Sequence, residues 1–265
     1  METAAIILAA GAGTRMKSKK PKVVHEVLGR PLVRWVVEAA KEAGADRVVT
    51  VVGHMRDQVI PLVEGDTEVV VQEAQRGTAD AVLAAADALA GFDGAVVVLS
   101  GDSPLIQPET IRQMAALREE HNAAVIVLTM ELENPFGYGR IVRDGAGEVA
   151  RIVEQKDASP EEAAITECNS GVYCFDACAL FDALSQVCLL YTSYLCALFA
   201  SACSGIIFSR RGFGAPAARL ALRTEIRSGW QAGHTHLPAL MRGYVSSHSQ
   251  PHSLHRTFTG DVELS

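Results

Sequence analysis

The sequence is short of positive charge. Its 24 lysines and arginines face 31 aspartates and glutamates, which gives a formal net charge of −7. A protein that binds nucleic acid non-specifically needs a basic face, so we expect no nucleic-acid partner. A nucleotide site is compatible with this charge, because backbone amides and a few local cations can hold phosphates within an acidic protein.

Cysteine is missing from the first 167 residues, and no pair of cysteines has the CxxC spacing. Disulfide frameworks and zinc sites depend on characteristic cysteine spacings, so neither is predicted here. We expect isolated thiols at Cys168, Cys174, Cys178, Cys188, Cys196 and Cys203.

A secretory leader is not evident at the start of the sequence. Residues 4–10 are apolar, but Glu2 precedes them where a signal peptide carries positive charge, and a glycine turn follows them. The segment therefore predicts a buried strand, and we expect a cytoplasmic protein.

Lysine is absent from residues 188–265, which hold seven arginines and only three acidic residues. Residues 188–209 carry no charge, and a run of 22 such positions has the length of a membrane helix or a buried core segment. A shifted reading frame or a joined, unrelated sequence explains better why lysine, acids and periodicity all vanish near Val187. We therefore assign no domain to residues 188–265 and expect no membrane association.

The first 187 residues alternate strand-like and helix-like segments. Strand-like runs such as residues 96–99 are apolar throughout, which is typical of parallel strands covered on both faces. This order predicts an α/β fold with a Rossmann-like, doubly wound, mostly parallel sheet, whose ligands bind beyond the carboxyl ends of the strands. The predicted strands cover residues 4–10, 47–52, 67–71, 95–100 and 123–130, and the predicted helices cover residues 31–43, 55–63, 78–90 and 108–120.

A glycine turn follows the first predicted strand. Gly11 and Gly13 let backbone amides approach a phosphate closely, and Arg15 adds a fork of donors for its oxygens. A dinucleotide fingerprint, GxGxxG, is not favoured, because Met16 replaces its third glycine. Lys22, in the short basic loop that follows, is a second expected phosphate contact.

Asp102 follows the predicted strand over residues 95–100. A carboxylate there would face the phosphate site, and Mg²⁺ prefers one or two carboxylates together with phosphate oxygens and water. A lone aspartate could equally cap the turn. The glycine turn on the neighbouring strand favours the metal.

An ordered series of motifs resembles the pyrophosphorylase domain of the bacterial N-acetylglucosamine-1-phosphate uridyltransferases. That family usually fuses this domain to a glucosamine-1-phosphate acetyltransferase. The resemblance implies that UTP and N-acetylglucosamine 1-phosphate are converted to UDP-N-acetylglucosamine and pyrophosphate, with Mg²⁺ as cofactor. The motifs occupy residues 8–16, 21–25, 29–31, 72–79, 134–141, 152–158 and 169–171.

The resemblance also implies a role for each matching residue. Arg15 and Lys22 would neutralise the phosphates, and Asp102 would bind Mg²⁺. A sugar-binding lobe after residue 130 would hold the sugar hydroxyls and the N-acetyl group through Gly139, Glu154 and Asn169. The uracil and the ribose would contact Leu8, Ala10, Gly11, Gln72, Gly77 and Thr78.

The sequence departs from the family pattern in two places. Asp80 replaces the histidine that is common after the glycine–threonine pair. After Val187 the pattern stops, so the asparagine that supplies a second metal ligand and the hexapeptide repeats that make the family trimeric are not found. We therefore expect a C-terminally incomplete transferase domain over residues 1–187, no acetyltransferase activity, one protein ligand for Mg²⁺ and a monomer.

Three alternatives stay open at this point. The first is a nucleotidyltransferase for another base or another sugar 1-phosphate. The second is a non-catalytic module that binds sugar nucleotides. The third is a membrane-tethered variant that uses residues 188–209.

Overall fold

The computed structural model describes residues 1–186, apart from 12, 14–15, 17, 146 and 148. The predictions for Arg15, for the uncharged run 188–209 and for the rest of the tail therefore lie outside the described residues. Within the described part of the chain, no helix is both long enough and apolar enough to cross a membrane.

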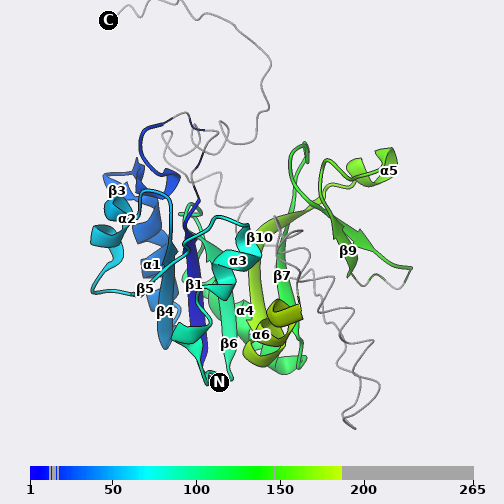
Figure 1. Cartoon of the computed structure of the whole chain (residues 1–265). Coiled ribbons are helices and arrows are strands. Elements are labelled where there is room, and N and C mark those ends of the chain that lie inside the picture. Colours follow the sequence, from blue (N-terminus) through cyan, green and yellow to red (C-terminus); the bar gives the residue numbers. More distant parts are fainter. Residues whose placement is uncertain (12, 14–15, 17, 146, 148, 187–265) are drawn as a thin grey trace, which may run out of the picture. The chain divides into compact units, whose positions relative to one another are not determined.

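The first half of the chain builds the parallel part of one eight-stranded sheet (Figure 1). Neighbouring strands pair in the order β5 (Glu68–Val71), β4 (Arg47–Val52), β1 (Thr3–Ala9) and β6 (Ala95–Ser100). All three of these pairings are parallel. Such an order places β1 and β6 at the centre, and it confirms the predicted α/β class.

The second half extends the same sheet with antiparallel strands. The long strand β10 (Glu167–Asp176) pairs with β6, and it also pairs with β7 (Val125–Glu131). Further along, β8 (Arg140–Arg143) pairs with both β10 and β9 (Val149–Val153). A short helix, α5 (Pro160–Ala163), begins with a capping box at Ser159 and joins β9 to β10.

Helices cover both faces of the sheet because the side chains of its central strands alternate between two cores. On β1, Ile6 belongs to one core and Ile7 to the other, and both are 0% exposed. The first core is completed by α3 (Thr78–Leu83) and α6 (Ala177–Gln186). The second is completed by α1 (Leu32–Glu42), α2 (Arg56–Val63) and α4 (Pro108–Glu120).

The remaining elements are small. The single-turn helix η2 (Lys22–Val24) follows the glycine turn, and η3 (Asp87–Leu89) precedes β6. Two short strands, β2 (Glu26–Val27) and β3 (Arg30–Pro31), form a hairpin that leads into α1.

One predicted helix is wrong in extent. The helix expected over residues 78–90 ends at Leu83, because the amides of Ala85 and Ala86 bond to carbonyls three residues back rather than four. Alanine is the strongest helix former, so the sequence carries no signal for this break. The helix over residues 108–120 and the strands over 47–52 and 95–100 have the predicted bounds.

The three described cysteines are free thiols in different surroundings. Cys168 and Cys174 are buried in β10, whereas Cys178 in α6 is exposed. Burial raises the pKa of the Cys168 thiol to about 11 and that of Cys174 to about 12. Both thiols are therefore protonated at neutral pH, as expected for isolated core cysteines.

We expect iodoacetamide at neutral pH to alkylate Cys178 in the folded protein while Cys168 and Cys174 stay unmodified. The thiolate is the reactive species, and the two core thiols are both neutral and shielded. Peptide mass mapping after timed labelling reports each cysteine separately, and all three should react in concentrated urea. If Cys174 reacts as fast as Cys178 without denaturant, the buried position of β10 is wrong.

Candidate active site

The carboxyl ends of β1 and β6 form the topological switch point of the sheet. The chain leaves β1 toward β4 through α1 on one face, and it arrives at β6 from β5 through α3 on the other face. In open α/β sheets of this kind, ligands bind outside the carboxyl ends at the switch point. The glycine turn follows β1 and Asp102 follows β6 at this place.

An ion pair between Lys22 and Asp102 joins the two segments. The Lys22 side chain is 25% exposed and the Asp102 side chain 22% exposed, so both keep access to a ligand. Gly13 has φ +60°, and a Cβ at this residue would lie 2.9 Å from the Cβ of Lys22. The glycine turn thus folds directly against the lysine, as a shared phosphate site requires.

A second close backbone approach, of Gly101 to Leu8, fixes the position of Asp102. The amide of Gly101 donates to the carbonyl of Leu8 at 2.9 Å, and a Cβ on Gly101 would meet that same oxygen at 2.9 Å. The buried side chain of Val23 packs over Gly101, since a Cβ there would lie 3.3 Å from its Cγ1. Because Lys22 precedes Val23 and Asp102 follows Gly101, this contact brings their charges together.

The carboxyl group of Asp102 is ionised at neutral pH. Burial acts to raise its pKa, but the charge of Lys22 and hydrogen bonds from Lys22 and Ser100 together lower the pKa below its ordinary value. The Ser100 hydroxyl donates to Oδ1 of Asp102 at 2.5 Å. The outcome is a fixed negative charge beside a lysine, at the point where phosphates would enter.

This donor set suits Mg²⁺ better than a metal that needs a protein cage. Among the residues that the structure describes, no group of three His, Cys, Asp or Glu side chains could hold a metal ion. Mg²⁺ usually takes one or two carboxylates and completes its shell with substrate phosphates and water. Asp102 fits that role as a single protein ligand.

The segments that follow β4 and β5 contact the carboxyl end of β1. The carbonyl of Ala10 accepts hydrogen bonds from the amide of His54 at 3.2 Å and from Nε2 of Gln75 at 2.9 Å. The amide of Gln72 donates to the carbonyl of Val52 at 2.8 Å. The segment predicted to hold the base is therefore adjacent to the glycine turn.

The side chain of Gln72 is buried, and two hydrogen bonds from its amide nitrogen fix its orientation. Its Nε2 donates to the carbonyl of Gly77 at 3.1 Å and to Oδ2 of Asp80 at 2.8 Å. Gly77 has φ +119°, a conformation that favours glycine, and Thr78 then begins α3. Asp80 is itself buried, and its other carboxylate oxygen pairs with Arg76 at 3.2 Å.

The three residues predicted to hold the sugar lie together. The amide of Asn169 donates to the carbonyl of Gly139 at 2.9 Å, and a Cβ at Gly139 would lie 3.4 Å from Oε1 of Glu154 and 3.6 Å from Cβ of Asn169. Because Tyr173 pairs with Val98 in antiparallel register, residues before Tyr173 lie toward the carboxyl end of β6. The sugar corner, defined as Gly139, Glu154 and Asn169, therefore lies toward the same sheet edge as Asp102.

A buried arginine that the sequence analysis missed braces the sugar corner. Arg140 is 1% exposed, and its guanidinium donates to the carbonyl of Tyr138, to Oε1 of Gln155 at 2.8 Å and to the carbonyl of Ala163 at 3.2 Å. The same Gln155 oxygen accepts from the amide of Gly137 at 3.0 Å. These bonds tie the loop before β8 to the segment after β9.

Most of the predicted site residues thus share one edge of the sheet. Gln75 and Ser100 also belong to that edge, although their residue types alone gave no reason to select them. The predicted residues at the carboxyl edge are Leu8, Ala10, Gly11, Gly13, Lys22, Gln72, Gly77, Thr78 and Asp102.

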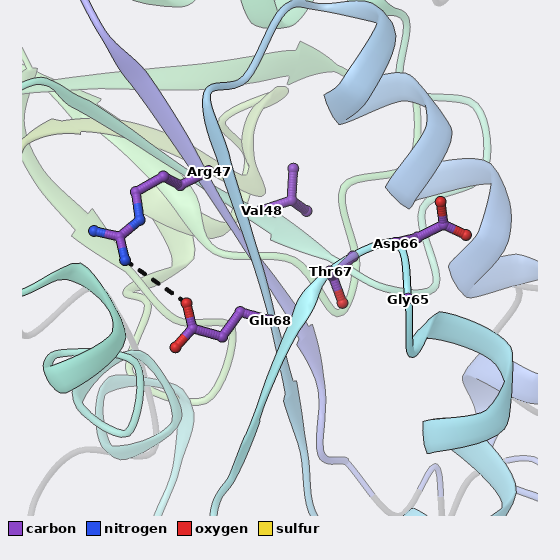
Figure 2. A pocket seen from close by; sticks show the side chains of 6 residues that line it. All are labelled: Arg47, Val48, Gly65, Asp66, Thr67 and Glu68. Atoms are coloured by element: carbon purple, nitrogen blue, oxygen red, sulfur yellow. Dashed lines mark ion pairs between the residues drawn. The ribbon is translucent and has the colours of Figure 1, made fainter.

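An open hollow of about 360 Å³ lies at the opposite edge, at the amino ends of β4 and β5 (Figure 2). Arg47 and Glu68 form an exposed ion pair there at 3.7 Å, and Asp66 points away from that pair (Figure 2). Hydrogen bonds from Lys41 and Arg34 lower the pKa of Asp66 to about 2. The cations near the hollow are thus already matched by carboxylates, so it offers no phosphate site. Its lining residues are Arg47, Val48, Gly65, Asp66, Thr67 and Glu68.

Two curated relatives, both named Bifunctional protein GlmU, match the part of the chain that carries these features. The relative from Pelotomaculum thermopropionicum is 51% identical over 187 residues, which cover 71% of this chain and 41% of the relative. The relative from Geobacter metallireducens is 53% identical over 188 residues, which cover 70% of this chain and 40% of the relative. The chain therefore spans about two fifths of the length of these relatives.

The fold is shared with a solved structure of UDP-glucose pyrophosphorylase complexed with UDP-glucose. The TM-score is 0.60 at 22% sequence identity, over 77% of this chain and 88% of that chain. Residues 5–188 also match the family model of the MobA-like NTP transferase domain. This match spans more than half of the sequence and confirms the predicted nucleotidyltransferase class: the chain belongs to the family of MobA-like NTP transferase domains.

Proposed function

We propose that the chain forms UDP-N-acetylglucosamine and pyrophosphate from UTP and N-acetylglucosamine 1-phosphate, with Mg²⁺ as cofactor. The observation that carries this proposal is the ion pair of Lys22 and Asp102 against Gly13 at the switch point. The proposal is supported by sequence identities of 51% and 53% to two proteins named Bifunctional protein GlmU. The sugar corner toward the same edge supports an acceptor that carries a sugar.

The reaction needs no nucleophile from the protein. A phosphate oxygen of the sugar 1-phosphate attacks the α-phosphorus of UTP in line, and the bond from that phosphorus to the leaving pyrophosphate breaks. The protein must align two anions and offset their charge, which is the usual basis of catalysis in phosphoryl transfer. Lys22 and Arg15 supply cations, and the turn at Gly11 and Gly13 supplies backbone amides. Mg²⁺, when held by Asp102, offsets the charge of the phosphates.

The nucleotide and the sugar would bind to different strands of the sheet. Gln72, Gly77 and Thr78 would contact the base beyond β5, while the sugar corner would receive the hydroxyls and the N-acetyl group of the acceptor. The fixed positions of both groups of residues supply the alignment. Arg140 would not contact the substrate; it would hold the loop before β8 and the segment after β9 in position.

A non-catalytic module that binds sugar nucleotides is the second candidate. It is favoured because, among the described residues, no group of three His, Cys, Asp or Glu side chains could hold a metal ion. Isothermal titration with UDP-N-acetylglucosamine, combined with an assay for pyrophosphate release from UTP, Mg²⁺ and N-acetylglucosamine 1-phosphate, separates the two. Binding with turnover supports the transferase, and binding without turnover supports the module. A folded chain that does not bind UDP-N-acetylglucosamine contradicts both.

We expect Lys22→Ala to weaken UTP binding by about 10- to 100-fold, because hydrogen bonds to charged groups contribute about 1.5–3 kcal/mol. Uridine, which has no phosphate, should bind the variant and the wild type equally. Lys41→Ala makes the same charge change near the opposite edge and should leave UTP binding unaltered. Titration calorimetry measures UTP and uridine binding to Lys22→Ala and UTP binding to Lys41→Ala. Equal UTP affinity for Lys22→Ala and the wild type would show that Lys22 does not belong to the phosphate site.

We expect Gly139→Ala to weaken binding of UDP-N-acetylglucosamine by about tenfold while UTP binds as before. The added methyl group would enter the sugar corner, 3.2 Å from Cγ2 of Ile152 and 3.4 Å from Oε1 of Glu154. Gly145→Ala is the matched control, since a Cβ at Gly145 meets nothing within 4 Å. Equal losses for both ligands would show that the substitution disturbs more than the sugar corner.

A further inference from the structure

The amide of Gln72 can present only one group to a ligand. Its nitrogen carries two hydrogens, and both are used by the Gly77 carbonyl and the Asp80 carboxylate. Both partners are acceptors, so turning the amide over would set its oxygen against two other oxygens. No residue among those described donates to Oε1 of Gln72. The group left for a ligand is therefore a hydrogen-bond acceptor.

Asp80, which accepts a hydrogen bond from Gln72, is itself buried between two partners. It is 7% exposed, in the first turn of α3, and each carboxylate oxygen has its own partner. Oδ2 accepts from Gln72 at 2.8 Å, and Oδ1 pairs with Arg76 at 3.2 Å. Arg76 thus keeps one oxygen of Asp80 occupied and leaves the other facing Gln72.

We propose that Asp80 is a positioning residue that sets the base preference of the site through Gln72. This inference rests on the proposed function, which places Gln72 against the base. An outward Oε1 bonds to a base whose ring nitrogen carries a hydrogen, as N3 of uracil does. N3 of cytosine is an acceptor, so Oε1 and that nitrogen would face each other without a hydrogen between them, an arrangement that binding sites reject.

The substitution Asp80→Asn tests the proposal with little change in shape. The asparagine oxygen should turn to Arg76, which is a donor, and its NH₂ group should then face Gln72. The new NH₂ group then opposes the wild-type orientation of the Gln72 amide, which only the Gly77 carbonyl still favours. The turned amide, with its nitrogen toward the base, therefore becomes accessible. We expect the ratio of UTP affinity to CTP affinity, measured by titration calorimetry, to fall about tenfold or more relative to the wild type.

A double variant provides the rescue. In Arg76→Ala/Asp80→Asn the asparagine oxygen no longer has Arg76 as a partner, so it can turn to Gln72 and restore the original amide. We expect the double variant to regain most of the preference for UTP over CTP. Arg76→Ala alone should keep the wild-type ratio. A purely structural role for Asp80 would give no such recovery.

The outcomes separate this inference from the proposed function. The inference is supported if the wild type binds UTP much more tightly than CTP, if Asp80→Asn loses this preference, and if the double variant regains it. Equal binding of UTP and CTP by the wild type overturns it, and so does a wild-type ratio in Asp80→Asn. Either result leaves the proposed reaction standing. If the folded wild type binds no UTP, the proposed function fails and the inference fails with it.

Discussion

The ion pair of Lys22 and Asp102 is the interaction on which the site depends, and backbone packing makes it. Two glycines allow the approach: Gly13 lies against Lys22, and Gly101 lies against the carbonyl of Leu8. At either glycine an added Cβ would come to 2.9 Å of its neighbour. The parallel pairing of β1 with β6 aligns the two strand ends, and the glycines let the segments beyond them touch.

The antiparallel strands of the sheet position part of the site, as its parallel strands do. β10 runs antiparallel to β6, so its first residues lie toward the carboxyl edge and Asn169 is placed there. The branch formed by β8 and β9 adds Gly139 and Glu154, and the buried Arg140 ties this branch together. The residues proposed to hold the nucleotide and the sugar corner thus come from separate parts of the chain that one sheet aligns. Hydrogen bonds from a charged group such as Arg140 generally contribute about 1.5–3 kcal/mol each, which suits a part that must hold its geometry.

Local signals in the sequence were sufficient for the parallel part of the sheet and for the grouping of the site, whereas the antiparallel strands β8, β9 and β10 were not predicted individually. Apolar runs bounded by glycines gave the strands, and the switch-point rule placed the turn after β1 and the aspartate after β6 at one edge. Features that depend on distant contacts were not predictable: the break after Leu83 occurs among alanines, and an arginine such as Arg140 gives no sign of burial. The orientation of Gln72 depends on Asp80, which the sequence showed only as a departure from a family pattern. The binding and catalytic roles of the site residues, Arg15 among them, and the assignment of residues 188–265 stay predictions.

We expect a sugar nucleotide to bind across the carboxyl edge of the sheet. A crystal structure of the chain grown with UDP-N-acetylglucosamine and Mg²⁺ tests this most directly. We expect uracil N3 within hydrogen-bond distance of Oε1 of Gln72, the diphosphate beside Lys22 and the sugar against Gly139. A ligand bound at another place, such as the hollow lined by Arg47 and Glu68, would contradict it.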